Sequence, residues 1–555
     1  MAELMAIDIE TYSDVSLPDC GVHRYASSPQ FEILLFAYSI DDGEIAVVDL
    51  ASGEEMPEEV MECLKDGSVI KTAFNAAFER TCINRFFHLD LQPESWHCTA
   101  VQASMLSLPL SLEGVGEALK LDKKKMTEGK ELIRYFCIPC KPTKSNGGRA
   151  RNLPSHAPEK WELFKTYCIR DVAVEMQIRK KLQKFPIPDK EQELYCMDQR
   201  INDRGILVDR ELITHAAACD LLYKEAASKR AYELSGLENP NSVSQLKACL
   251  QEKGVEAGSL AKAAVEELVE KNEGEVSEMM KLRLAMSKTS IKKYEAMERS
   301  VCPDGRVHGL LQFYGANRTG RWAGRLVQIH NLPQNHMEDL ELARSLVKEG
   351  RYDLIELLYD STPEVLSELI RTAFVAKEGC RFIVSDFSAI EARVMGYLAG
   401  EGWVMEEFRG AGKIYEQTAA KMFHIPIGEI TKGSPYRARG KVASLACQYG
   451  GAEGALISMG ALNFVEESEL KGLVQSWRSA NPHIVNFWYE IDGAVKAAVK
   501  EHKATTVGRV CVFYQSGMLM IRLPSGRVLS YVRPRMTVNR FGSGSVCYEG
   551  VGVNK

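Results

Sequence analysis

The sequence predicts a multidomain chain of mixed α/β and α+β class, and three observations support this. At about 150 residues per domain, 555 residues correspond to three or four domains. Short apolar runs suited to strands open the chain in LMAIDIE, EILLFAYSI and EIAVVDL, and helical patterning follows near 114–135 and 159–183. From about 190 to 300 the chain is mostly helical and charged, and beyond 300 it is mixed. We expect an α/β domain over 1–185, followed by a second large region over 190–555.

Composition excludes some classes and favours others. With 45% hydrophobic and 26% charged residues, the chain is typical of globular proteins. It has no apolar run long enough for a membrane span and no signal-peptide pattern, and its 15 cysteines indicate reduced thiols, so we expect a cytoplasmic protein. The single CxxC, Cys137 to Cys140, has no second pair at zinc spacing, and a loop with two thiols is the simpler interpretation.

The net charge of −6 argues against a general polyanion binder, but local charge is more informative. Basic residues gather in four segments, any one of which is more often a solvated face than a phosphate site. Three of them lie beside the motifs described below. The four segments are 141–151, 318–325, 432–441 and 522–540.

Two carboxylates lie close to the N-terminus. Asp8 and Glu10 lie in the strand-like run MAIDIET, and residues two apart on a strand point to the same face. Burying both is costly unless a cation lies between them, and hard oxygen ligands suit Mg²⁺ or Mn²⁺. An exposed acidic pair is the simpler alternative for this pattern alone.

Two further segments extend the acidic pattern. FNAAFE places Asn75 four residues before Glu79, and YCIRD places Tyr167 four residues before Asp171 in a helical stretch, where that spacing gives one face. In this order the segments resemble the motifs DxE, NxxxD and YxxxD of the proofreading DEDDy 3′–5′ exonucleases. The resemblance covers about 1–185 and implies an RNase H-like sheet, two metal ions and in-line attack by water on a phosphodiester.

The resemblance also implies roles for particular residues. Asp8, Glu10, Glu79 and Asp171 would hold metal ions, and Tyr167 would orient the nucleophilic water. Glu79 departs from the family pattern, which usually has aspartate there, so the carboxylate reaches one methylene further. A degenerate domain that keeps only the fold is the alternative interpretation.

A second acidic segment lies near the middle of the chain. RFIVSDFSAIEARVMGYLAG (381–400) predicts a buried strand, a polar turn and then a helix, with Asp386 at the strand end and Glu391 in the first turns of the helix. A carboxylate at a strand end is well placed to bind a metal beside a cleft. The apolar helix positions are Ile390, Val394 and Leu398.

A helical stripe follows in YRARGKVASLACQYGG (436–451). Arg437, Lys441, Leu445 and Tyr449 recur every four residues, which places them along one side of a helix. Two cations followed by an apolar residue and a ring fit a nucleotide laid along that helix, with its triphosphate near the cations. An ordinary amphipathic helix is the alternative for the stripe alone.

Together the two segments resemble motif A (DYSQIELR) and motif B (RxxxKxxxFxxxYG) of family A, or DNA polymerase I-type, DNA polymerases. The resemblance implies that Asp386 binds a catalytic metal ion and that Glu391 closes over the sugar, which favours DNA over RNA synthesis. Arg437 and Lys441 would grip the triphosphate, with Lys441 among the catalytic residues, and Tyr449 would lie near the templating base. Leu445 stands where the family usually has an aromatic residue, which leaves its effect on nucleotide binding open.

Other segments extend the resemblance over about 190–555, with a thumb over about 190–300 and palm and fingers over 301–555. TGRWAGRLVQIHNLP (319–333) resembles a segment near the primer–template, where Arg321 would contact the minor groove and His330 and Asn331 would lie near the DNA. RGILVD and NPNS resemble the start of the polymerase region and its thumb. NPHIVNFW and LPSGRVLSY are similar to phage and prophage members.

The family's third motif, His-Asp-Glu on a palm hairpin, occurs nowhere in the sequence. We therefore expect an incomplete palm, truncated before that motif. Three interpretations stay open: a replicative phage-type polymerase with proofreading, an active exonuclease whose polymerase region only binds DNA, or half of a split enzyme whose second chain supplies the motif. The expected partners are Mg²⁺ or Mn²⁺, dNTPs and primer–template DNA, with no membrane; the oligomeric state is left open.

Overall fold

A five-stranded mixed sheet forms the centre of the N-terminal part of the protein. The structure is a computed structural model that describes residues 2–121, 128–240, 242–288, 291–316, 318–539 and 542–550. The strands, in spatial order β3-β2-β1-β4-β5, are β1 (Leu4–Tyr12), β2 (Glu32–Ile40), β3 (Ala46–Val48), β4 (Ile70–Ala73) and β5 (Trp96–Cys98). β1 pairs antiparallel with β2 and parallel with β4. The predicted α/β character and the first three strands are thus confirmed.

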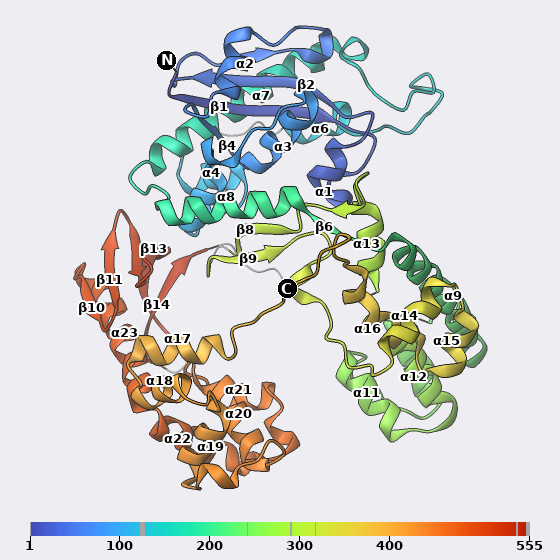
Figure 1. Ribbon diagram of the computed structural model, residues 1–555, viewed down its shortest axis with the longest axis vertical. Coiled ribbons are helices and arrows are strands. Elements are labelled where there is room, and N and C mark those ends of the chain that lie inside the picture. The colour runs from blue at the N-terminus through green and yellow to red at the C-terminus, as the bar shows by residue number, and fades with distance from the viewer. Residues whose placement is uncertain are drawn as a thin grey trace. The chain divides into compact units, whose positions relative to one another are not determined.

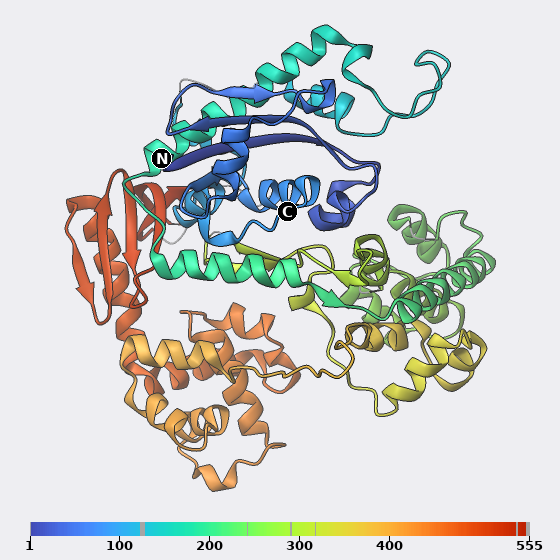
Figure 2. The ribbon, with the colours of Figure 1, turned by 45° about the horizontal axis from the view of Figure 1, so that its top comes forward.

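Helix α7 (Pro158–Leu182) packs along β1 and β2, as both ribbon views show (Figures 1 and 2). Its apolar face enters a core in which the rings of Phe136, Trp161, Phe164 and Tyr167 follow one another in contact. This packing fixes the rotation of α7 about its axis, and so also fixes its polar residues beside β1. The remaining helices of this part are α1 (Leu17–Ala26), α2 (Glu58–Lys65), α3 (Ala76–Phe87), α4 (Thr99–Met105), α5 (Leu112–Ala118) and α6 (Gly129–Phe136).

The following region is mostly helical, as predicted. Helix α8 (Asp189–Arg204) lies alongside β8 of a two-stranded hairpin (Figures 1 and 2). In the sequence, ENPNS (238–242) is a turn and helix-start signal, and Ser242 is indeed the N-cap of α10. The elements are β6 (Ile206–Leu207), α9 (Arg210–Ser235), α10 (Val243–Glu252), α11 (Lys262–Lys271), α12 (Gly274–Met286), α13 (Lys292–Ser300), β7 (Arg306–Val307), β8 (Leu311–Ala316), β9 (Arg321–Gly324), α14 (Leu340–Lys348), α15 (Tyr352–Leu358) and α16 (Thr362–Leu369).

The C-terminal region combines a helical cluster with an antiparallel sheet. The sheet has the order β10-β11-β12-β13-β14, in which each strand pairs with the next one along the chain. The helices are α17 (Ile390–Ala399), α18 (Gly402–Arg409), α19 (Ile414–Phe423), α20 (Pro435–Cys447), α21 (Glu453–Ser458), α22 (Leu470–Ala480) and α23 (Pro482–Glu501). The strands are β10 (Thr505–Val507), β11 (Val510–Gln515), β12 (Met518–Arg522), β13 (Val528–Val538) and β14 (Gly544–Glu549).

The chain forms two compact units. The first comprises Met1–Gln102, Leu110–Ala316 and Gly320–Phe382, and the second comprises Ala103–Pro109, Asn317–Thr319 and Ile383–Lys555. The predicted boundary near 185–190 lies inside the first unit, between α7 and α8. In the part of the chain that the structure describes, no helix is both long and apolar enough to cross a bilayer.

The strand predicted at 381–385 is wrong. This segment has no strand assignment, and Ile383 and Val384 are 88% and 90% exposed. The apolar run does favour a strand locally, but a strand also needs a neighbour to complete its hydrogen bonds. Among the described residues, no strand pairs with it. The helix predicted after it is confirmed as α17.

Candidate functional site

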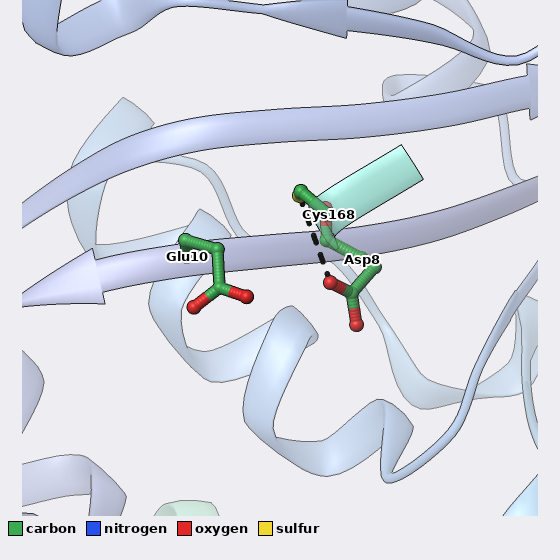
Figure 3. A group of neighbouring side chains, drawn as sticks. All are labelled: Asp8, Glu10 and Cys168. Carbon is green, nitrogen blue, oxygen red and sulfur yellow. Dashed lines mark hydrogen bonds between the residues drawn. The ribbon is translucent and has the colours of Figure 1, made fainter. Parts of the chain in front are cut away.

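Strand β1 presents two carboxylates on the same face. Asp8 is half-buried and Glu10 is buried, and Figure 3 shows both side chains projecting to the same side of the strand. The pairing of β1 with β2 shifts register between Glu10 and Thr11, and such bulges re-aim side chains beside functional sites. The thiols of Cys168 and Cys137 donate to Asp8 Oδ2 and Glu10 Oε2, at 3.7 and 3.8 Å.

Helix α3 brings a third carboxylate to this site. Its N-cap, Asn75, has a left-handed backbone with φ of 97°, and Glu79 follows in the first turn. Glu79 is only 4% exposed. Burial, and then the charge of Asp8, raise the pKa of Glu79 well above its ordinary value. Among the described residues, its Oε2 has no hydrogen-bond partner.

Helix α7 adds a phenol and a fourth carboxylate. Tyr167 and Asp171 are both buried on one side of α7, and their side chains are hydrogen-bonded to each other. Burial, followed by the charges of Glu10 and Asp171, raises the pKa of Tyr167. The structure therefore brings together all five residues that the sequence assigned to the first site.

The position of the Tyr167 ring depends on a glycine of α6. A Cβ added at Gly129 would lie 2.1 Å from Tyr167 Cε2, which is closer than any real contact. The ring also stacks on Phe164 of the same helix, with the centroids 6.0 Å apart. Helix α6 thus limits the space that is open to the Tyr167 ring.

One acidic residue of this region was missed from the sequence. Glu175 follows Asp171 by one helical turn, is buried, accepts a hydrogen bond from Thr99 Oγ1, and adds its charge to those acting on Glu79. Burial raises the pKa of Glu175. The spacing of 167, 171 and 175 was the available signal, because it continues the same helical stripe.

The donor chemistry of this cluster fits divalent cations. Several carboxylates face one another in a buried space, and oxygen ligands of this kind suit Mg²⁺ or Mn²⁺. The buried and unpartnered Oε2 of Glu79 is a further indication, because such an atom costs free energy unless something binds it. Asp8, Glu10, Glu79 and Asp171 are the residues that could hold the ions.

The residues predicted to contact DNA lie in and after the β8–β9 hairpin. Arg321 begins β9 and is exposed, as are His330 and Asn331 in the following turn. The His330 ring packs against Gly324, where an added Cβ would lie 2.3 Å from Nδ1. These three residues belong to the first unit, whereas the other predicted polymerase residues belong to the second.

The hairpin is anchored to α8 by a buried carboxylate. Trp322 Nε1 donates to Asp198 Oδ1 at 2.8 Å, and Gln199 and Asn202 donate to Oδ2 at 3.0 and 3.1 Å. Burial raises the pKa of Asp198 to about 6, and these hydrogen bonds oppose that shift.

The two carboxylates of the predicted motif A lie in different structural environments. Asp386 lies on the exposed segment that forms no strand. Glu391 is in the first turn of α17, as predicted. Two of the predicted apolar helix positions, Ile390 and Val394, are exposed, while Leu398 packs against a core cluster.

Helix α20 carries the predicted basic stripe. Arg437, Lys441 and Leu445 lie on it, while Tyr449 follows its last residue and is exposed. Lys441 is exposed, but Arg437 Nε donates to Glu416 Oε1 of α19 at 2.6 Å. The two helices approach closely, since a Cβ at Gly440 would lie 2.7 Å from Tyr415 O. The sequence did not predict this ion pair.

Comparison with known proteins identifies the family of the chain. A family model described as DNA polymerase family A matches residues 222–520. The DNA polymerase of Bacillus phage SP02 is 55% identical over 550 residues, which cover 98% of this chain and 85% of that protein. DNA polymerase I of Pseudomonas aeruginosa is 27% identical over 286 residues, covering 48% of this chain and 28% of that protein.

One solved structure has a similar fold. It is the polymerase domain of Pol1 from M. smegmatis in complex with DNA primer-template and dNTP, with a TM-score of 0.58. The match covers 91% of this chain and 77% of that chain at 18% identity, so it concerns the fold alone. Fold and relatives together define a DNA-directed DNA polymerase. The family model covers more than half of the chain and the phage relative nearly all of it, so the chain belongs to DNA polymerase family A. Enzymes of this family generally use divalent metal ions.

Proposed function

We propose that this protein extends DNA primers on a template in DNA replication and removes 3′-terminal nucleotides at a separate 3′–5′ exonuclease site. The convergence of carboxylates from β1, α3 and α7 carries the exonuclease proposal, because one buried cluster unites all three predicted motifs. The polymerase proposal is supported by family membership and by the basic stripe on α20.

In the exonuclease site, two Mg²⁺ or Mn²⁺ ions would neutralise phosphate charge and activate water. The chain's own residues would position the other components. Asp8, Glu10, Glu79 and Asp171 would hold the ions. Tyr167, whose ring lies against Gly129 and Phe164, would place its hydroxyl where it orients the attacking water. The long reach of Glu79 would be accommodated by its place in the first turn of α3.

In the polymerase region, Arg437 and Lys441 would bind the triphosphate of a dNTP, and Leu445 and Tyr449 would line the space for sugar and base. Asp386 would hold a divalent cation and Glu391 would exclude a 2′-hydroxyl. Arg321, His330 and Asn331 would contact the primer–template. Before Arg437 can bind a triphosphate, its ion pair with Glu416 has to open or share the guanidinium.

A second candidate is an enzyme that degrades DNA 3′ ends but only binds DNA through its polymerase region. The exposed segment around Asp386 favours it, because among the described residues no strand fixes the position of that carboxylate. A third, in which a second chain completes the polymerase site, would behave in the same way when this chain is assayed alone.

The test is a gel assay of the purified chain on a 5′-labelled primer–template with Mg²⁺. Shortening without dNTPs that is lost in Asp8→Ala would support the exonuclease. Lengthening with dNTPs that is lost in Asp386→Ala would support the polymerase. Shortening without lengthening selects the second candidate, or the third if a separate chain restores lengthening. Neither reaction, with DNA binding retained, would contradict both catalytic proposals for this chain.

A further inference from the structure

A sulfur ligand lies beside the carboxylates of the candidate exonuclease site. Cys168 follows Tyr167 on α7 and is fully buried. Its Sγ lies 3.7 Å from Asp8 Oδ2 and 3.8 Å from the Asp8 carbonyl oxygen. Figure 3 shows Cys168 reaching Asp8 from α7, with Glu10 beside it on β1.

The three side chains form a compact donor set. One ligand atom from each of Asp8, Glu10 and Cys168 lies within 4.8 Å of the other two. Metal–sulfur bonds of about 2.3 Å and metal–oxygen bonds of about 2.1 Å would allow one ion to reach all three after small side-chain movements. In the described part of the chain, no other group of three acidic, cysteine or histidine side chains is arranged in this way.

A second observation points to a ligand at the same place. Glu79 is only 4% exposed, and its Oε2 has no hydrogen-bond partner among the described residues. Asp8 is the neighbouring charge that acts on Glu79 most strongly. A buried, unpartnered carboxylate oxygen that also feels the charges of neighbouring carboxylates indicates a missing positive charge. The Cys168 thiol therefore contacts a group of carboxylates that a bound cation would stabilise.

We propose that Cys168 is a third protein ligand of the cation held by Asp8 and Glu10, and that its sulfur makes this site prefer a softer divalent cation than Mg²⁺. This inference rests on the proposed exonuclease function. On binding, the thiol proton leaves to solvent and a metal–sulfur bond forms, with no change of oxidation state. Soft thiolate donors favour Zn²⁺, Co²⁺ or Cd²⁺, whereas Mg²⁺ prefers oxygen and keeps its waters.

The test is a Co²⁺ titration of the full chain after removal of metals, followed by absorption in the near ultraviolet, where thiolate-to-cobalt charge transfer appears. The wild-type protein should show this band, and Cys168→Ser should lose it. The Co²⁺ affinity of Cys168→Ser should fall by at least about tenfold, the cost of losing even an outer partner of a metal site. Its Mg²⁺ affinity should stay within about twofold. Cys137→Ser is the matched control, because that thiol touches Glu10 but is outside the three-residue group, and it should keep the band.

The outcomes separate this inference from the proposed function. Co²⁺ binding that is lost in Asp8→Asn but shows no charge-transfer band would overturn the role of Cys168 and leave the exonuclease metal site standing. No metal binding at all would count against both. If Cys168→Ser does not fold, ¹¹³Cd NMR of the wild-type protein decides, because the shift of a single bound Cd²⁺ reports sulfur coordination directly. A shift typical of oxygen ligands alone would contradict the inference.

Discussion

The candidate exonuclease site and the segment around Asp386 both consist of a carboxylate motif on an apolar run, yet they differ in structure. β1 has neighbours on both sides, and helices α3 and α7 bring further acidic residues to its carboxylates. Residues 381–387 have no strand neighbour among the described residues, and Asp386 is exposed. The comparison shows that a motif supplies ligand types, but packing from distant segments decides whether they converge.

The largest expected effect concerns the candidate exonuclease site, the first of the two regions compared. Glu79→Gln keeps the size of the side chain but removes one negative charge from the buried cluster. We expect the exonuclease rate to fall by about 1000-fold, which corresponds to about 4 kcal/mol of transition-state stabilisation. The metal-free variant should not be less stable than the parent, because repulsion with Asp8 is removed. Gel assays and thermal unfolding with EDTA measure the two effects.

Glu62→Gln is the control for this substitution, since Glu62 lies on the exposed face of α2. It should leave exonuclease activity unchanged. Full activity in Glu79→Gln would instead mean that Glu79 holds no cation, and that the unpartnered oxygen has another cause.

The second prediction concerns pH and the anchor of the β8–β9 hairpin. The pKa of Asp198 is raised from 3.8 to about 6, so the folded state binds the proton more tightly than the unfolded state. Its contribution to stability is therefore present below about pH 4 and lost as pH rises through about 6. Because asparagine does not titrate, the Asp198→Asn variant lacks this pH-dependent loss of stability. The difference in unfolding free energy between variant and parent should move in favour of the variant by about 2 kcal/mol from pH 4 to pH 7.

Denaturant unfolding at both pH values checks the result. Asp203→Asn is not a suitable control, because Asp203 is paired with Arg80. Asp189→Asn is better placed, since Asp189 lies exposed in the first turn of α8. A pH-independent difference for Asp198→Asn would show that Asp198 titrates normally in the folded protein.

The sequence predicted local features well where they depend on short spacing. The apolar runs of β1 and β2, the helix carrying Tyr167 and Asp171, and the helix start at Ser242 all follow from residues within a few positions. The convergence of the three exonuclease-like segments was expected only from their resemblance to a family, and several other features that depend on distant segments were missed. They include the ion pair of Arg437 with Glu416, the approach of Cys168 to Asp8, and the unpaired segment at 381–385.

The third prediction tests how far the packing of Tyr167 against Gly129 matters for the candidate exonuclease site. Gly129→Ala would place a methyl group 2.1 Å from Tyr167 Cε2, so the ring or helix α6 has to move. We expect a loss of about 1–3 kcal/mol in stability, typical of overpacking, and a clear fall in exonuclease rate. Gly116→Ala on α5 is the matched control, because its added Cβ would make ordinary contacts at 3.7 and 3.9 Å. Equal effects of the two substitutions would show that helix propensity, rather than the Tyr167 contact, is responsible.

The smallest expected effect concerns the exposed segment around Asp386, the second of the two regions compared. Val384 is 90% exposed, so Val384→Ser removes almost no buried apolar surface and should change the unfolding free energy by no more than about 0.5 kcal/mol. Val172→Ser, at a fully buried position of α7, provides the contrast and should cost about 2 kcal/mol or more, because it buries a hydroxyl and leaves a cavity. Chemical denaturation of both variants measures the difference. A cost for Val384→Ser close to that for Val172→Ser would mean that residues 381–385 are covered in solution, and that Asp386 is held in place as firmly as Asp8.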